Sequence, residues 1–172
     1  MSEIYQPKLM TIEEIKHYDK DGNCIWEEYD LPNIWHITGQ QFVLSVAFDT
    51  DGDFSIPSSY YAGVDARSTL AGDDTLDSIT DEPSTNGYAR QAISSTTGFS
   101  VSLTGGVMKA VSGLIAFAAS GGTWGPVTNM FFATTSDDSG TLITSVALSG
   151  SRIVAAGEIL TVRVNLSLAG CP

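Results

Sequence analysis

From Gly87 onward the chain is a succession of short β-prone segments, separated by clusters of Gly, Ser, Asn and Asp. Short strands divided by such turns are typical of β-sandwiches and small barrels. In the last segment, Leu160, Val162 and Val164 alternate with polar residues, as in a strand buried on one face. We therefore predict an all-β fold, an antiparallel β-sandwich of jelly-roll-like type. The predicted strands cover residues 88–94, 99–103, 107–119, 130–134, 141–148 and 158–168.

The start of the chain predicts an extended arm followed by a β-hairpin. Pro7 disfavours a helix in residues 1–10. Residues 11–30 contain two β-prone runs around an Asp21-Gly22 step, which is a strong turn signal. Neither face of the return strand is uniformly apolar. We therefore expect the hairpin to be partly exposed or to rest on another chain.

A mild boundary near Gly39 divides the chain into an arm and hairpin over residues 1–40 and a β-sandwich domain over residues 41–172. The second part opens with the apolar run 41–48, which fits either a buried strand or a short helix. We favour a strand, because the run is brief and no helix C-cap follows it. A strand at 60–65 comes next, and then a long loop with one helical turn.

The charge of the chain is strongly acidic and unevenly distributed. Residues 1–82 hold 17 acidic and 4 basic residues (−13), whereas residues 83–172 hold 3 and 4 (+1), which gives −12 in total. A surface this acidic repels phosphate, so we expect no binding to nucleic acid. No apolar run approaches the roughly 18 residues of a membrane span. The N-terminus is also unlike a signal peptide, so we expect no membrane partner.

Nothing in the sequence indicates catalytic or cofactor chemistry. The two histidines, His17 and His36, both precede the predicted β-sandwich domain, and no nucleophile-elbow pattern occurs. Zinc-protease, P-loop and dinucleotide-binding motifs are also missing from the sequence. Beyond residue 82 the only acids are Asp137, Asp138 and Glu158, which offers little to a glycosidase that needs paired carboxylates. We expect no enzyme activity and no cofactor.

Two acidic turns imitate the first half of a calcium-binding loop. The candidate ligands are Asp19, Asp21 and Asn23 in one turn, and Asp49, Asp51 and Asp53 in the other. Both turns lack the glycine at position six and the glutamate at position twelve of an EF-hand. Sequences rich in Asp, Asn and Gly commonly form simple turns. We therefore predict no metal site, with the second turn as a weak calcium candidate because it gathers three carboxylates.

Several aromatic residues could be read as a platform for carbohydrate. They are Trp26, Trp35, Trp124, Tyr60, Tyr61 and Tyr88. Aromatic side chains more often fill a core or a subunit interface, because each buries a large area. We favour core or interface packing for this set.

Segments in both halves of the chain share their pattern with one class of known proteins. They are Tyr18–Asn23, Ile25–Glu28, Asn33–His36, Tyr60–Asp65, Thr75–Leu76, Glu82–Gln91, Trp124–Val127, Phe131–Thr134, Ser149–Arg152 and Ala156–Val162. With these segments the chain resembles small virion structural proteins of tailed bacteriophages. The resemblance covers most of the chain and implies a virion part without catalytic residues. Proteins of this class include capsid decoration (cement) proteins, head fibres and tail components.

Among these we favour a capsid decoration protein, assembled in the host cytoplasm, that binds and stabilises the major capsid protein shell. The resemblance and the symmetry of capsid sites imply a homotrimer on the capsid surface. The alternative is a tail-tip, tail-fibre or head-fibre protein that contacts the host surface, for example by binding a glycan. A cell-wall hydrolase is the least favoured class. Bulky apolar residues of the arm, hairpin and linker are the predicted capsid or subunit contacts. They are Ile4, Tyr5, Leu9, Met10, Ile12, Trp26, Ile34 and Trp35.

Overall fold

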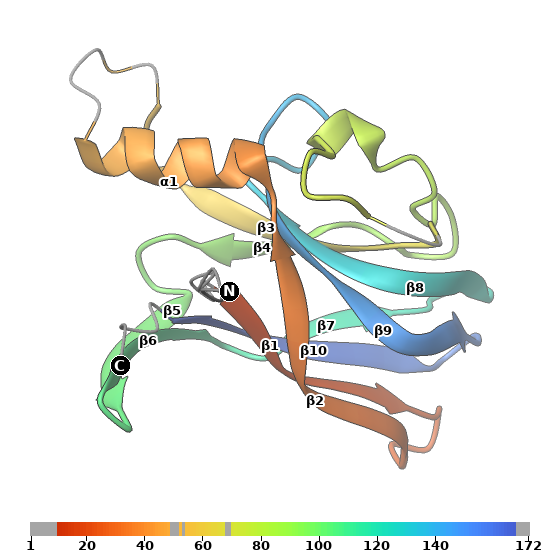
Figure 1. The fold of residues 1–172 in the computed structure, drawn as a ribbon. Coiled ribbons are helices and arrows are strands. Elements are labelled where there is room, and N and C mark those ends of the chain that lie inside the picture. The colour runs from red at the N-terminus through yellow and green to blue at the C-terminus, as the bar shows by residue number, and fades with distance from the viewer. Residues whose placement is uncertain (1–9, 49–51, 53, 68–69, 168–172) are drawn as a thin grey trace, which may run out of the picture.

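The computed structural model describes residues 10–48, 52, 54–67 and 70–167, and strands dominate this part of the chain (Figure 1). An α-helix, α1 (Ile37–Phe48), and a 3-10 turn, η1 (Leu76–Ser78), interrupt them. The strands are β1 (Met10–Tyr18), β2 (Cys24–Trp35), β3 (Ser59–Asp65), β4 (Gln91–Ser94), β5 (Phe99–Thr104), β6 (Val107–Ser112), β7 (Ile115–Ala118), β8 (Trp124–Ala133), β9 (Leu142–Val154) and β10 (Ile159–Ser167).

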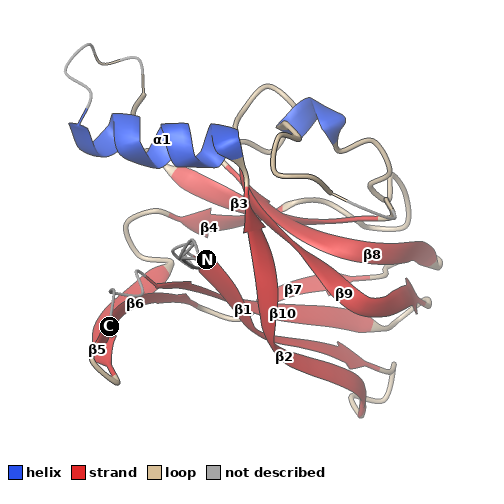
Figure 2. Ribbon diagram, in the orientation of Figure 1, coloured by secondary structure: helices blue, strands red, loops and turns tan. Residues whose placement is uncertain are grey.

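The strands form one antiparallel sheet that is nearly closed into a barrel (Figure 2). Their order is β4-β3-β8-β9-β2-β1-β10-β6-β5, and β7 pairs with β10 beside this path. Two layers face each other, with β3, β8 and β9 in one and β1, β10 and β7 in the other. The predicted all-β class is confirmed.

Strand β2 joins the two layers, because its two ends pair with different neighbours. Its first part pairs with β1 as far as Pro32, and residues from Asn33 to Trp35 pair with β9. Asp30, shortly before this transition, has a φ of 50°. A strand that bends from one sheet into the other makes a corner of the fold. The corner at β2 explains how the two layers belong to one continuous sheet.

The predicted N-terminal hairpin is present, and its strands lie in the middle of the sheet. The Asp19 carboxylate accepts hydrogen bonds from the backbone amides of Asp21 (2.9 Å) and Asn23 (2.8 Å), which closes the turn as the Asx-rich sequence predicts. β1 pairs with β2 along one edge and with β10 along the other. Ile12 and Ile15 of β1 are buried in the core. The predicted boundary near residue 40 falls inside α1.

The strand favoured for residues 41–48 is wrong, because these residues form most of α1. The helix begins directly after β2, where the His36 amide donates to Ile143 of β9 and the Gln40 amide donates to the His36 carbonyl. Gly39 and Phe42 are its buried residues. The ring of Phe42 meets Tyr60 of β3 edge to face at 6.4 Å. Packing across β9 and β3, rather than a capping sequence, therefore holds this helix.

The single strand predicted over residues 107–119 is divided into β6 and β7. Both pair with β10, β6 at residues 165–167 and β7 at residues 159–162. At the gap between them the hydroxyl of Ser112 accepts a hydrogen bond from the amide of Val164 (2.9 Å). A side chain thus replaces the missing strand partner of a buried amide. The other strands predicted from residue 60 onward are found, although β8 and β9 are longer than expected.

The core lies between the two layers and is apolar. Phe117, Ile15, Leu160, Val127 and Val154 are among its fully buried side chains. Tyr60, Phe99 and Phe132 pack together with ring centroids 5.3–6.4 Å apart in the aromatic group that includes Phe42. A smaller apolar cluster under the 66–86 loop includes Leu76, Ile79 and Phe131.

His36, at the junction of β2 and α1, is a buried histidine with a structural role. Its Nε2 lies 2.8 Å from the hydroxyl of Ser145 on β9. Burial lowers the pKa of His36 from its ordinary value of 6.5, because the charged imidazolium loses solvation. His36 in the unfolded chain therefore binds a proton near pH 6.5, whereas His36 in the folded chain binds it only at lower pH. Stability contributed by the neutral ring is complete above pH 6.5 and is lost as the pH falls below it.

We expect acidification from pH 7 to pH 5.5 to lower the unfolding free energy through His36, by at most about 1.4 kcal/mol for each pH unit below 6.5. Urea unfolding of the wild type and of His36→Gln across this range measures the effect. The amide keeps a polar partner for Ser145 but does not titrate, so the pH dependence of the variant should be smaller by that amount. Equal pH dependence in both proteins would show that His36 does not contribute.

Candidate interaction surface

The two histidines of the chain are both buried and contribute to no accessible site. His36 and Ser145 form a histidine–serine pair, but both side chains are buried away from any substrate. His17 is also buried and lies 2.8 Å from the carboxylate of Glu158. Within the described residues, no group of three or more His, Cys, Asp or Glu side chains could hold a metal ion. The weak calcium candidates Asp49, Asp51 and Asp53 lie outside the described residues.

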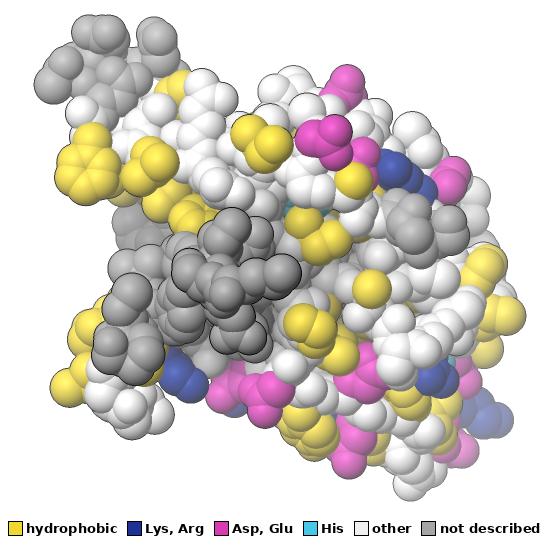
Figure 3. Space-filling view, viewed as in Figure 1, with side chains coloured by type: hydrophobic (Ala, Val, Ile, Leu, Met, Phe, Trp, Pro, Cys, Tyr) yellow, Lys and Arg dark blue, Asp and Glu magenta, His cyan; other side chains and the backbone are white. Residues whose placement is uncertain are grey.

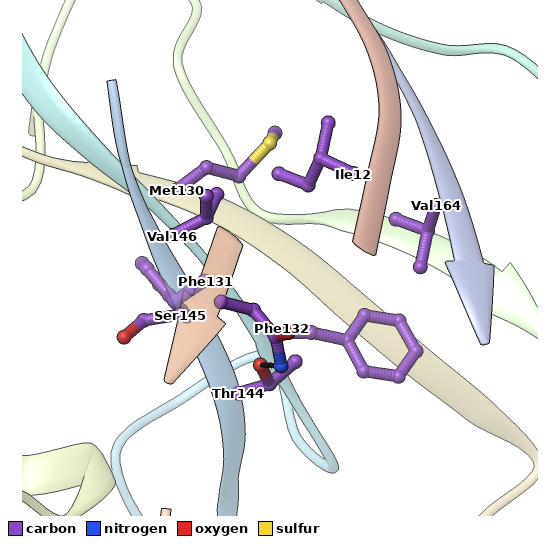
Figure 4. A pocket seen from close by; sticks show the side chains of 9 residues that line it. Ile12, Met130, Phe131, Phe132, Thr144, Ser145, Val146 and Val164 are labelled. Atoms are coloured by element: carbon purple, nitrogen blue, oxygen red, sulfur yellow. Dashed lines mark hydrogen bonds between the residues drawn. The ribbon is translucent and has the colours of Figure 1, made fainter. Parts of the chain in front are cut away.

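The cavity between the two layers is too small for a ligand. Its volume of about 10 Å³ is close to the space of one water molecule. Figure 4 shows its mainly apolar lining from β1, β8, β9 and β10. The side-chain amide of Asn33 in β2 also lines it and donates to the hydroxyl of Thr144 (2.9 Å). The lining residues are Ile12, Asn33, Met130, Phe131, Phe132, Thr144, Ser145, Val146 and Val164. This cavity is a packing gap in the core.

A second hollow, of about 250 Å³, is polar and lies between the loop segment 81–85 and residues 123–126 at the start of β8. The side-chain amide of Asn86 donates to the backbone carbonyl of Thr123 (2.6 Å) and connects the two segments. Two carboxylates, Asp81 and Glu82, line the hollow, and Glu82 accepts hydrogen bonds from the Tyr88 hydroxyl (2.6 Å) and the Arg90 guanidinium (2.9 Å). Because these contacts occupy Glu82, its carboxylate acts as a structural tie.

Arg90 fastens the long loop before β4 to the turn between β8 and β9. Its guanidinium is almost completely buried, contacts Asp138 at 2.6 Å in addition to Glu82, and lies over the ring of Phe131 at 5.1 Å. The two carboxylates raise the pKa of Arg90 against the opposing effect of burial. A paired, buried cation of this kind supports the fold and leaves no charge free for a ligand.

The predicted contact residues are found in different places. Ile4, Tyr5 and Leu9 lie outside the described residues, and Met10 begins β1. Ile12 faces the core. The half-buried residues are Trp26, which lies under the guanidinium of Arg152 (3.9 Å), Ile34, which packs on the smaller apolar cluster, and Trp35. Their role as virion contacts stays a prediction.

Three of the aromatic residues weighed as a sugar platform pack in the core. Trp124 is buried, and its indole meets the ring of Tyr88 at 5.7 Å. Tyr88 also stacks on Phe117 at 6.1 Å. Tyr60 is part of the aromatic group around Phe42. For these side chains the expected core packing is confirmed.

Twelve large apolar side chains of the described residues are exposed, and six of them lie on two elements that the sequence analysis did not single out. On α1 they are Ile37, Leu44 and Phe48, and Phe48 is 79% exposed. Spacings of seven and eleven residues place all three on one side of a helix, and α1 carries no charged residue. We call these three residues the α1 stripe. Leu44 and Phe48 belong to the apolar run 41–48, in which no period distinguishes exposed from buried residues.

The second element is the hairpin of β5 and β6. Val101, Leu103 and Met108 are exposed on it, and Leu103 is 69% exposed. Figure 3 shows apolar side chains over both elements at the same end of the molecule, which in Figure 1 carries the C-terminal end of α1 and the β5–β6 hairpin. These two groups of exposed apolar side chains are the candidate interaction surface.

A family model described as "Podophage GP4 fiber I protein gp80" matches residues 47–167. The match begins at the end of α1 and runs through β10, so it includes β3 to β10 and the β5–β6 hairpin. No curated protein matches the chain at a significant level. None of the helices in the described ranges has the length and apolar character needed to cross a bilayer.

Proposed function

The chain belongs to the family of the podophage GP4 fiber I protein gp80, and from this membership in a family of tailed-phage virion structural proteins we propose that it is a fibre-type subunit of a virion. The observation that carries the proposal is the extent of the match, which covers residues 47–167. This segment contains eight of the ten strands, from β3 to β10, and therefore most of the folded body.

The proposed subunit acts through contacts and catalyses no reaction. The histidines are buried, the interior cavity holds about one water molecule, and Glu82 in the polar hollow is engaged by Arg90 and Tyr88. The exposed groups that stand out are instead apolar, on α1 and on the β5–β6 hairpin. Surfaces of this kind suit assembly with other protein subunits.

A capsid decoration protein is the second candidate, and the part of the chain before the family match favours it. The predicted contact residues all precede residue 47, from Ile4 to Trp35. Two members of the α1 stripe, Ile37 and Leu44, also precede it. In this reading the N-terminal region binds the major capsid protein at the capsid surface, and homotrimers occupy sites of local threefold symmetry.

Copy number distinguishes the two candidates. We expect quantitative mass spectrometry of purified virions, with heads and tails separated, to find the protein at far fewer copies than the major capsid protein, as suits a fibre. Copy numbers comparable to the major capsid protein in the head fraction would support the decoration protein instead. Absence from both fractions would contradict both proposals.

A further inference from the structure

The β5–β6 hairpin is shaped by a two-glycine turn. Gly105 and Gly106 have φ values of 60° and 79°, the left-handed conformation that a tight hairpin turn requires at both central positions. The pairing continues without a register shift from Phe99 opposite Ser112 to Thr104 opposite Val107. The hairpin is thus a regular two-stranded ribbon up to its tip.

One face of this ribbon is an apolar stripe that continues the core. Val101 pairs with Ala110 and Leu103 pairs with Met108, and alternate pairs point to the same face. On that face Phe99, two residues before Val101, packs against Phe132 in the core at 6.3 Å. The core-facing side therefore extends past the body, where Val101, Leu103 and Met108 are exposed. We call these three residues with Ala110 the hairpin stripe.

Nothing in the described parts of the chain covers this end of the sheet. β5 is the last strand of the sheet path, and within the described ranges it pairs only with β6. Proteins usually protect such an edge with a charge, a proline, a bulge or a very short strand. β4, at the other end of the path, has only four residues and follows Arg90. β5, with the sequence FSVSLT, has none of these protections.

Charge indicates which partner fits the hairpin stripe. The chain carries −12 overall, and two copies repel each other where their residues 1–82 meet, because this part holds the acidic excess. From Phe99 to Ser112 the only charged residue is Lys109, which pairs with Ser102 on the face opposite the stripe. Copies that meet at the hairpin stripe bring no acidic side chains of that segment together. A basic partner, in contrast, gains no charge attraction at this place.

We propose that copies of this chain associate with one another through the hairpin stripe, so that Val101, Leu103, Met108 and Ala110 of one copy pack against the same residues of its neighbours. The contact is apolar and self-complementary, and it lies within the segment matched by the fibre family. It concerns association between copies, and it is independent of where in a virion the protein is placed.

Light scattering coupled to size-exclusion chromatography of the full chain, over a wide concentration range, tests the proposal. The wild type should have a mass of two or three times the 18.2 kDa of one copy. Leu103→Lys should raise the dissociation constant at least about 100-fold for a pair of copies, since each loses one buried leucine worth about tenfold. A wild type that is monomeric at every concentration would overturn the proposal.

Ser100→Lys is the matched control, because it adds the same charge to the same strand on the opposite face, where its strand partner is the uncharged Val111. It should associate like the wild type, and dissociation equal to that of Leu103→Lys would count against the stripe. Met108→Lys, on the neighbouring strand, should dissociate the protein as Leu103→Lys does, and normal association would overturn the proposal. Circular dichroism and thermal unfolding verify that each variant is folded, as exposure of these side chains leads us to expect.

Discussion

Replacing Ile15 by alanine should lower the free energy of unfolding by about 2–5 kcal/mol. Ile15 lies in β1 at the centre of the sheet, and its side chain is completely buried between the layers. The substitution removes buried methyl groups and leaves a cavity that the flanking strands cannot close. Since small proteins have total stabilities of about 5–15 kcal/mol, the loss should be large in a urea titration.

Ile25→Ala is the control for this prediction, since Ile25 is in the other strand of the same hairpin and is 53% exposed. Its effect should stay within about 0.5 kcal/mol. If the hairpin were an appendage that rests on other proteins, the two substitutions would have similarly small effects on the isolated chain. That result would contradict the position of β1 between β2 and β10.

The sequence predicted the all-β class because most strands show their burial pattern locally. In β10, Leu160, Val162 and Val164 are buried, as their alternation with polar residues predicts. β1 lacks such a pattern for a physical reason. A register shift between Ile12 and Glu14 interrupts its pairing with β10, so Ile12 and Ile15 are both buried although they are three residues apart. A bulge of this kind hides a core strand from any period of two.

The place of the hairpin in the sheet also depends on partners far along the chain. Ile12 pairs with Val164, and His17 meets Glu158. No local signal in residues 11–30 identifies these partners, so the same two strands fit an exposed hairpin equally well. The turn, in contrast, could be predicted from the sequence. The Asp19 carboxylate and Asn23 are close in sequence, so their contact follows from local chemistry.

Exposed apolar surfaces escape sequence analysis for a related reason. Val101 and Leu103 alternate with serine, a pattern that predicts a strand with one buried face. The pattern is correct for Phe99, which packs on the core, but the hairpin extends beyond the body at Leu103. Periodicity identifies the face of a strand. It does not reveal which residues of that face remain inside the folded chain.

The α1 helix was mistaken for a strand because its residues are apolar on the exposed side as well as the buried side. Phe42 is buried, whereas Leu44 and Phe48 are exposed, so the run shows neither a period of two nor one of 3.6. The feature that positions the helix is Gly39, which allows its backbone to approach β9. A β-carbon at this position would lie 2.6 Å from the Cα and 2.8 Å from the carbonyl carbon of Ile143.

Gly39→Ala should therefore destabilise the protein by about 3 kcal/mol, the upper end of the usual cost of overpacking. The sign of this change in stability is informative, because alanine in an unobstructed helix is about 1 kcal/mol more favourable than glycine. The obstacle is the backbone of Ile143 in β9, which cannot move aside as a side chain could. The helix must instead lift away and weaken the contact of Phe42 with Tyr60. Urea unfolding measures the change.

Gly113→Ala provides the matched control, since a β-carbon there meets nothing within 4 Å. Its backbone lies outside the left-handed region, so alanine should leave stability unchanged or raise it by up to about 1 kcal/mol. A stabilising effect of Gly39→Ala, similar to that of Gly113→Ala, would show that α1 is not pressed against β9. The contact of Gly39 with β9 sets which side of α1 faces solvent. Without it, the exposed position of the α1 stripe would no longer be explained.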